Sequence, residues 1–182
     1  MNRLLTALAL AAAIATGGAA QAALVTFNDP AIIDIDGAGI ATYSESGYII
    51  TGPVTSFQLT NDFRLAGGFD NTPFSFKSSD GGEFSLLSLD ADFYALMPGD
   101  TTSTLTLTGL LGGSTVASRV ITLAGLNPLV FGADWARVTE VTFSGNGGFF
   151  LDNISAVPEP GTLALSSGAL LLLGLRTLRR RG

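Results

Sequence analysis

The chain has 182 residues, no cysteine, no histidine and a formal net charge of −6 at pH 7. The absence of histidine excludes Ser-His-Asp and Cys-His nucleophilic schemes and the usual transition-metal sites, and the absence of cysteine excludes disulfides. Four of the nine basic residues lie at the extreme C-terminus, so the remainder is more acidic than the total suggests. Because phosphate backbones are bound by clustered Lys and Arg, nucleic acid is not an expected partner.

The first 22 residues predict a secretory signal peptide. Residues 1–3 carry a positive charge, residues 4–14 are almost entirely apolar, and Ala20-Gln21-Ala22 has the small-x-small pattern of a cleavage site. Cleavage is expected after Ala22, with cleavage after Ala20 as the alternative. An amphipathic helix of the mature fold fits poorly, because the stretch has no polar face. Signal peptidase is therefore an expected partner.

Residues 23–156 predict one exported all-β domain. Short runs of β-forming residues alternate with turns rich in Gly, Asn, Asp and Pro, and no helical period occurs before the C-terminal run. The clearest strand is 102–110, where threonine alternates with leucine, and strands 74–77 and 83–89 flank an Asp-Gly-Gly turn. The other expected strands are 24–27, 31–35, 48–50, 54–59, 92–96, 115–123, 138–143 and 149–154. About ten short strands at this spacing predict an antiparallel two-sheet β-sandwich of jelly-roll type.

Carboxylates are numerous but carry little chemical information. Glycoside hydrolysis needs two of them, and Asp90 and Asp92 lie on one face of an expected strand, with Glu83 and Glu140 as further candidates. In an acidic domain, solvated strand positions are the simpler interpretation. No catalytic residue is therefore expected, and the protein is not expected to be an enzyme.

Two groups of aspartates are candidate calcium sites. The stretch 34–37 (Asp-Ile-Asp-Gly) resembles the start of a calcium loop but lacks the closing glutamate. Asp29 and Asp152 lie near the two ends of the expected domain, and proteins of jelly-roll type sometimes hold a structural Ca²⁺ between their chain ends. Neither group gives sufficient reason to expect a bound metal or any other cofactor.

Aromatic residues that could stack on sugar rings are few. There is one tryptophan, Trp135, and three tyrosines, Tyr43, Tyr48 and Tyr94, whereas the 12 phenylalanines are expected to fill the core. Trp135 lies in an expected loop beside Asp134, which makes it the best single candidate for a binding contact. A structural, half-buried tryptophan is the alternative.

The C-terminal residues 157–182 form a module of three parts. The first is Val157-Pro158-Glu159-Pro160, where each proline favours extended backbone in the residue before it. An extended segment that is poor in hydrogen bonds is therefore expected, which is the shape that a protease cleft prefers.

The second and third parts predict a membrane span with a positive end. Residues 162–178 contain one charge, Arg176, and would form about 25 Å of helix, which is short for a hydrocarbon core of about 30 Å. The arginine cluster that follows places the C-terminus in the cytoplasm by the positive-inside rule. The expected anchor residues are Leu163, Leu165, Leu170, Leu171, Leu172, Leu173 and Leu175, followed by Arg179, Arg180 and Arg181.

In this order, the three parts resemble the PEP-CTERM sorting signal of exported bacterial proteins. The resemblance implies recognition by exosortase, a membrane-embedded processing enzyme similar to cysteine proteases, with removal of the tail and release or surface attachment of the domain. Arg176 departs from the pattern, because it shortens the uninterrupted apolar run to residues 162–175. The stretch 150–154 also resembles the last strand of small jelly-roll domains that precede this signal, whose relatives include carbohydrate-binding modules.

The sequence therefore predicts an exported, non-catalytic surface or extracellular-matrix protein. It would pass through a single-pass membrane intermediate in the inner membrane, with its domain outside the cytoplasm, and end at the cell surface or outside the cell. A carbohydrate-binding module for exopolysaccharide is the alternative function, and a polysaccharide-degrading enzyme comes third.

Overall fold

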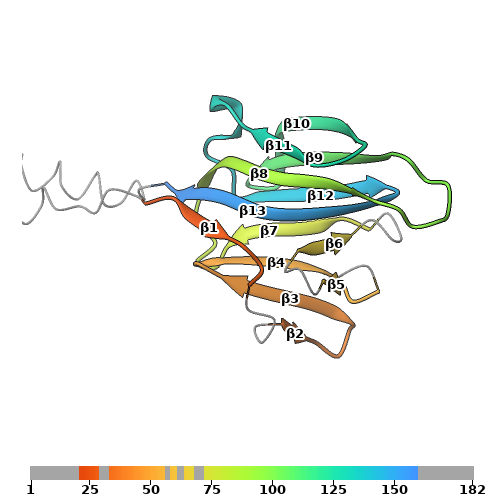
Figure 1. Cartoon of the computed structure of the whole chain (residues 1–182). Coiled ribbons are helices and arrows are strands. Elements are labelled where there is room, and N and C mark those ends of the chain that lie inside the picture. The colour runs from red at the N-terminus through yellow and green to blue at the C-terminus, as the bar shows by residue number, and fades with distance from the viewer. Residues whose placement is uncertain (1–20, 29–32, 56–57, 61–63, 68–71, 160–182) are drawn as a thin grey trace, which may run out of the picture. The chain divides into compact units, whose positions relative to one another are not determined.

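The computed structural model describes residues 21–28, 33–55, 58–60, 64–67 and 72–159 (Figure 1). The core of the expected signal peptide, Ala20, Asp29, Pro160 and the expected C-terminal span with its arginines lie outside these residues. Within the described ranges, no helix combines the length and the apolarity that a membrane crossing requires. The compact unit that these residues form runs from Ala22 to Glu159.

The described strands form two antiparallel sheets that pack face to face (Figure 1). In the first sheet the order is β11-β8-β13-β6-β5, with β1 paired to β13, and in the second it is β10-β9-β12-β7-β4-β3-β2. The first sheet contains β1 (Ala23–Val25), β5 (Gln58–Leu59), β6 (Leu65–Gly67), β8 (Phe84–Tyr94), β11 (Asn127–Val130) and β13 (Gly148–Pro158). The second contains β2 (Ile33–Ile35), β3 (Ile40–Glu45), β4 (Tyr48–Pro53), β7 (Phe74–Ser78), β9 (Ser103–Leu111), β10 (Ser114–Leu123) and β12 (Glu140–Asn146). The predicted all-β fold with two antiparallel sheets is confirmed.

Several elements differ from the prediction. The strands expected over 83–89 and 92–96 are one continuous strand, β8, in which the aspartates occupy outward positions instead of ending it. β3, β6 and β11 were not expected as strands. In β3 the alternation is inverted, because Ile40 is 37% exposed while the smaller Ala41 is buried, so the usual apolar signal misleads.

Leucine and phenylalanine side chains from both sheets form the core. In β9 the leucines Leu105 and Leu107 face inward and the threonines outward, as the period of two predicts. Phe76 of the second sheet meets Phe84 of the first in an edge-to-face contact, with ring centroids 5.3 Å apart. Such pairs add roughly 0.5–1.5 kcal/mol to the burial of their area, so they help to fix how the two sheets meet.

The carboxylate of Glu45 fastens one sheet to the other at the start of the domain. It accepts hydrogen bonds from the backbone N–H groups of Thr26 and Phe27, from the Thr26 hydroxyl and from the Tyr43 hydroxyl, each at 2.9 Å. Glu45 ends β3 in the second sheet, whereas Thr26 and Phe27 follow β1 in the first. Four bonds to a partly buried charged acceptor therefore hold the N-terminal strand in place.

The proline-flanked motif belongs to the sandwich. The backbone is extended through Pro158, as the prolines predict, but Val157 pairs with Ser85 and Pro158 with Phe84 of β8. The expectation that this segment is poor in hydrogen bonds is therefore wrong for residues 157–159. The extended backbone that suits a protease cleft is also the backbone of a β-strand, and here it pairs with β8. The sandwich consequently continues beyond residue 156, where the exported domain was expected to end.

Two buried tyrosines should respond differently to loss of the hydroxyl. The Tyr43 hydroxyl bonds to Glu45, whereas the Tyr48 hydroxyl is buried and has no hydrogen-bond partner in the described part of the chain. Tyr43→Phe is expected to lower the free energy of unfolding by about 1.5–3 kcal/mol, because it removes a bond to a charged group. Tyr48→Phe should leave it unchanged or raise it. Urea denaturation of both variants measures the difference, and equal losses would contradict the assignment.

Stability should fall at alkaline pH through Tyr48. Burial, and secondly the charge of Asp80, raise the pKa of Tyr48 to about 12, and Asp80 is itself held ionised by the Ser78 hydroxyl, whose bond lowers the Asp80 pKa. In the unfolded chain the Tyr48 hydroxyl loses its proton near pH ~10, whereas in the folded chain it keeps that proton until about pH 12. The contribution of Tyr48 to stability is therefore fully present below about pH 10 and is lost as the pH rises toward about 12. A loss of roughly 2–3 kcal/mol is expected. Tyr48→Phe should flatten this part of the pH profile; a profile identical to that of the wild type would refute the cause.

Candidate functional site

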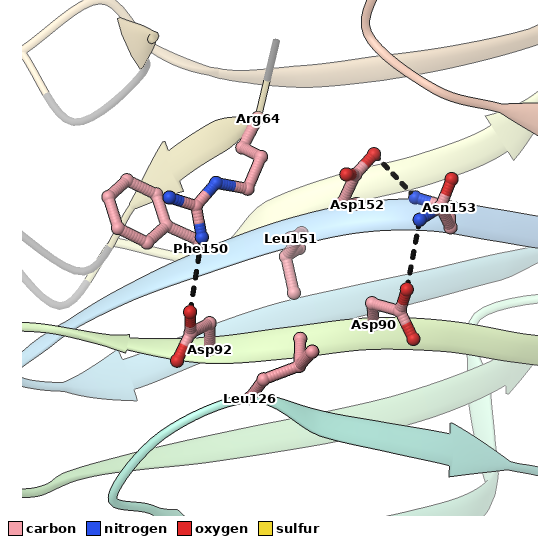
Figure 2. A pocket seen from close by; sticks show the side chains of 8 residues that line it. All are labelled: Arg64, Asp90, Asp92, Leu126, Phe150, Leu151, Asp152 and Asn153. Carbon is pink, nitrogen blue, oxygen red and sulfur yellow. Dashed lines mark hydrogen bonds and ion pairs between the residues drawn. The ribbon is translucent and has the colours of Figure 1, made fainter. Parts of the chain in front are cut away.

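A groove of about 240 Å³ opens on the outer face of the first sheet (Figure 2). Its floor comes from β8 and β13, whose outward side chains alternate with the buried core residues Leu89, Ala91 and Phe149. The lining residues are Arg64, Asp90, Asp92, Leu126, Phe150, Leu151, Asp152 and Asn153. The groove thus combines apolar, cationic, anionic and amide groups within one small surface.

The register of β8 against β13 decides which side chains meet in the groove. Asp92 lies opposite Phe150 and Asp90 lies opposite Asp152. The register then shifts between Asp152 and Ser155, and Asn153 adopts a left-handed backbone with φ of 49°. Such a bulge turns side chains away from strict alternation. Two consecutive residues, Asp152 and Asn153, therefore both line the groove.

One half of the groove is organised by the Arg64 guanidinium. Its central carbon lies 4.1 Å from the centroid of the Phe150 ring, and its Nη1 lies 3.1 Å from Asp92 Oδ2. The ring of Tyr94 packs beside Phe150, with centroids 4.8 Å apart. A cation over an aromatic face and a charge-assisted bond act on the same guanidinium, so its plane is held in one orientation.

The other half is acidic. Asn153 Nδ2 donates to Asp90 Oδ2 at 2.9 Å, and the Asn153 backbone N–H donates to Asp152 Oδ1 at 2.7 Å (Figure 2). Like charges directly opposite each other on neighbouring strands are destabilising, and here Asn153 bonds to both carboxylates. This half offers carboxylate oxygens and an amide whose orientations are set by the bulge.

The sequence-predicted carboxylates divide into two groups. Asp90 and Asp92 share the groove, as expected from their spacing on one strand face. Glu83 instead pairs with Arg137, with Nε and Oε2 2.9 Å apart, and Glu140 pairs with Lys77, with Nζ and Oε2 3.2 Å apart. Glu83 and Glu140 lie outside the groove lining.

Trp135 is not a binding contact. Its side chain is 2% exposed and packs against Phe131, with ring centroids 4.9 Å apart. It ends a short 3-10 helix, Ala133–Trp135, which turns the indole into the core. Tyr43 and Tyr48 are also buried, so Tyr94 is the tyrosine that reaches the vicinity of the groove.

Two of the aspartates considered for calcium, Asp36 and Asp152, have other contacts in the described structure. Asp36 Oδ1 accepts from the backbone N–H groups of Ala38 and Ile40, both at 2.9 Å, and so shapes the turn between β2 and β3. Asp152 lies in the groove, and its proposed companion Asp29 is outside the described residues. Across the described ranges, no group of three or more acidic side chains is placed to hold a metal ion.

Sequence reasoning missed Arg64, Phe150 and Asn153. Arg64 is distant from Phe150 in the sequence, and no local pattern predicts that the two side chains are in contact. Phe150 did carry a signal, because Phe149 and Phe150 are adjacent in a strand and successive side chains point to opposite faces. One of the two rings therefore had to face outward.

Comparison with known proteins gives distant likenesses alone. No family model matches the chain, and no curated protein matches it. Similar solved structures include a DUF4465 family protein from Bacteroides caccae, which is 14% identical, with a TM-score of 0.44 and coverage of 78% of this chain and 88% of that one. A structure described as "CBM4 structure and function" is 13% identical, with a TM-score of 0.33 and coverage of 79% and 90%. One described as "Carbohydrate binding module family29" is 16% identical, with a TM-score of 0.34 and coverage of 75% and 88%. At these values the likenesses carry no argument about what this chain binds.

Proposed function

We propose that the chain is an exported, non-catalytic binding protein whose groove on the first sheet takes a saccharide. The observation that carries the proposal is the fixed Arg64 guanidinium, held between Phe150 and Asp92 beside a second polar pair, Asp90 and Asn153. A sugar ring presents several hydroxyl groups, each both donor and acceptor, together with apolar C–H surface. Guanidinium, carboxylate and amide groups can satisfy such hydroxyls, and apolar neighbours can cover the rest.

The size and charge of the groove narrow the proposal. Its volume of about 240 Å³ is just below the ~300–1,000 Å³ of typical small-molecule sites, so a short saccharide, or a short segment of a polymer, would occupy it. Leu126, which is 64% exposed, adds apolar surface at one side. Asp92 is engaged by Arg64 and Asp90 by Asn153, an arrangement that suits hydrogen bonding to a ligand better than proton transfer.

The targeting part of the proposal is supported by the two ends of the sequence. Signal peptidase would act at residues 20–22, and exosortase would recognise Val157-Pro158-Glu159-Pro160, while residues 162–181 held the intermediate in the inner membrane. The domain would then reach the cell surface or the extracellular matrix, where exopolysaccharide is the available saccharide. The resemblance to PEP-CTERM proteins supports this route.

Saccharide binding is tested with the purified protein on a panel of soluble and insoluble glycans that includes bacterial exopolysaccharides. Arg64→Ala and Phe150→Ala are each expected to raise the dissociation constant at least about tenfold, which is a loss of roughly 1.4 kcal/mol of binding free energy. The matched control is Arg119→Ala, because Arg119 also lies over a phenylalanine, 5.7 Å from the Phe131 centroid, away from the groove. Absence of binding across the panel, or equal effects of all three changes, would defeat the proposal.

Processing is tested by the mass of the protein recovered from a Gram-negative host with and without exosortase. With the enzyme, both the signal peptide and the C-terminal tail should be missing. Without it, only the signal peptide should be removed, and the protein should fractionate with membranes. An intact 182-residue chain that remains soluble in the cytosol would rule out the targeting route.

A further inference from the structure

We propose that the last residues of β13 form a clasp which withholds the C-terminal motif from proteases until the strand end separates from β8. The clasp is defined as residues 157–159, at the end of β13, which are held by Glu83 and Ser85, with Arg137 bonded to Glu83 beside them. This inference rests on the proposed function only in assuming that the motif is a processing signal. The clasp itself follows from contacts within the sandwich.

The end of β13 is held by backbone and side-chain bonds together. Val157 and Pro158 pair with Ser85 and Phe84 in the antiparallel ladder. Beyond the ladder, the Glu159 backbone N–H donates to the Glu83 carbonyl at 2.9 Å, and the Ser85 hydroxyl donates to Glu159 Oε1. The motif glutamate is thus bound to β8 and its start through both its main chain and its carboxylate.

The start of β8 is bonded to Val138 on the side away from β13. It therefore stays in place when residues 157–159 separate from it. Phe84 is fully buried and exchanges two backbone bonds with Val138, at 2.8 and 2.9 Å. Next to it, Arg137 Nε donates to Glu83 Oε2 at 2.9 Å. The pKa of Arg137 is raised first by that bond, then by the charge of Glu83 and, least, by the charge of Glu159, so the guanidinium also attracts the motif glutamate.

The clasp is short enough to open without unfolding the domain. On the other edge of β13, β1 pairs with Ile154, Ser155 and Ala156 and stops there. Residues 157–159 are therefore held by β8 and its neighbours alone in the described structure, and Pro158 is exposed. Strand ends of this kind open locally at a fraction of the global free energy of unfolding. Proteases bind substrates as extended chain with free edges, so such opening must come before cleavage.

The test uses a proline-specific endoprotease on the full chain in detergent micelles, with products identified by mass. Cleavage after Pro158 should be slow in the wild type and about tenfold faster in Ser85→Ala and in Glu159→Gln. Ser85→Ala removes the donor to the Glu159 carboxylate and Glu159→Gln removes the charge of that acceptor, so each weakens the clasp and raises the open population. Ser88→Ala, a change of the same kind on the same strand, is the matched control and should leave the rate unchanged. Cleavage after Pro128 in β11, a different strand of the same sheet, reports opening outside the clasp and should not accelerate.

Each outcome decides the matter. Wild-type cleavage after Pro158 that is as fast as in both variants would overturn the clasp. Parallel acceleration at Pro128 in both variants would also overturn it, because the opening would then not be confined to the clasp. The assay contains no exosortase, so it stands apart from the processing experiment. Protection in the assay without processing in cells would refute the sorting function and keep the clasp. Processing in cells without protection would do the reverse.

Discussion

The pairing of β8 with β13 is the constraint on which the groove, the core and the C-terminal end all depend. The two strands run antiparallel from Gly148 opposite Tyr94 to Pro158 opposite Phe84. Their inward side chains, such as Leu89 and Leu151, are buried in the core. A slip of one residue would turn these side chains to solvent and the groove aspartates inward, so burial of the core also fixes which residues can meet a ligand.

The groove exists because this pairing is interrupted at one point. The shift between Asp152 and Ser155 sends two consecutive side chains outward, while Ile154 returns to the core. The local cost is a left-handed Asn153 and two carboxylates on directly opposite residues. Stability alone would favour other residues at these positions, and the burial of the surrounding core offsets the cost.

Much of the fold could be predicted from the sequence, because one-sided burial leaves a period of two in strands such as β9. The prediction failed where that period is hidden. In β3 an isoleucine faces outward and an alanine inward, and in β11 Pro128 reads as a break although an edge strand tolerates it. The site was less predictable. The spacing of Asp90 and Asp92 predicted one carboxylate in each half of the groove. Arg64 reaches Phe150 only through long-range packing, and the indole of Trp135 is turned inward by a 3-10 turn.

The N-terminal strand β1 pairs with the C-terminal strand β13. Ala23 lies opposite Ala156, so the first and last strands of the sandwich are hydrogen-bonded neighbours. A domain whose ends adjoin in this way suits circular permutation: a short linker could join them, and new ends could be opened at Gly112 and Gly113, a tight turn with positive φ at both positions. The same proximity allows the sandwich to be inserted as a cassette into a loop of another protein.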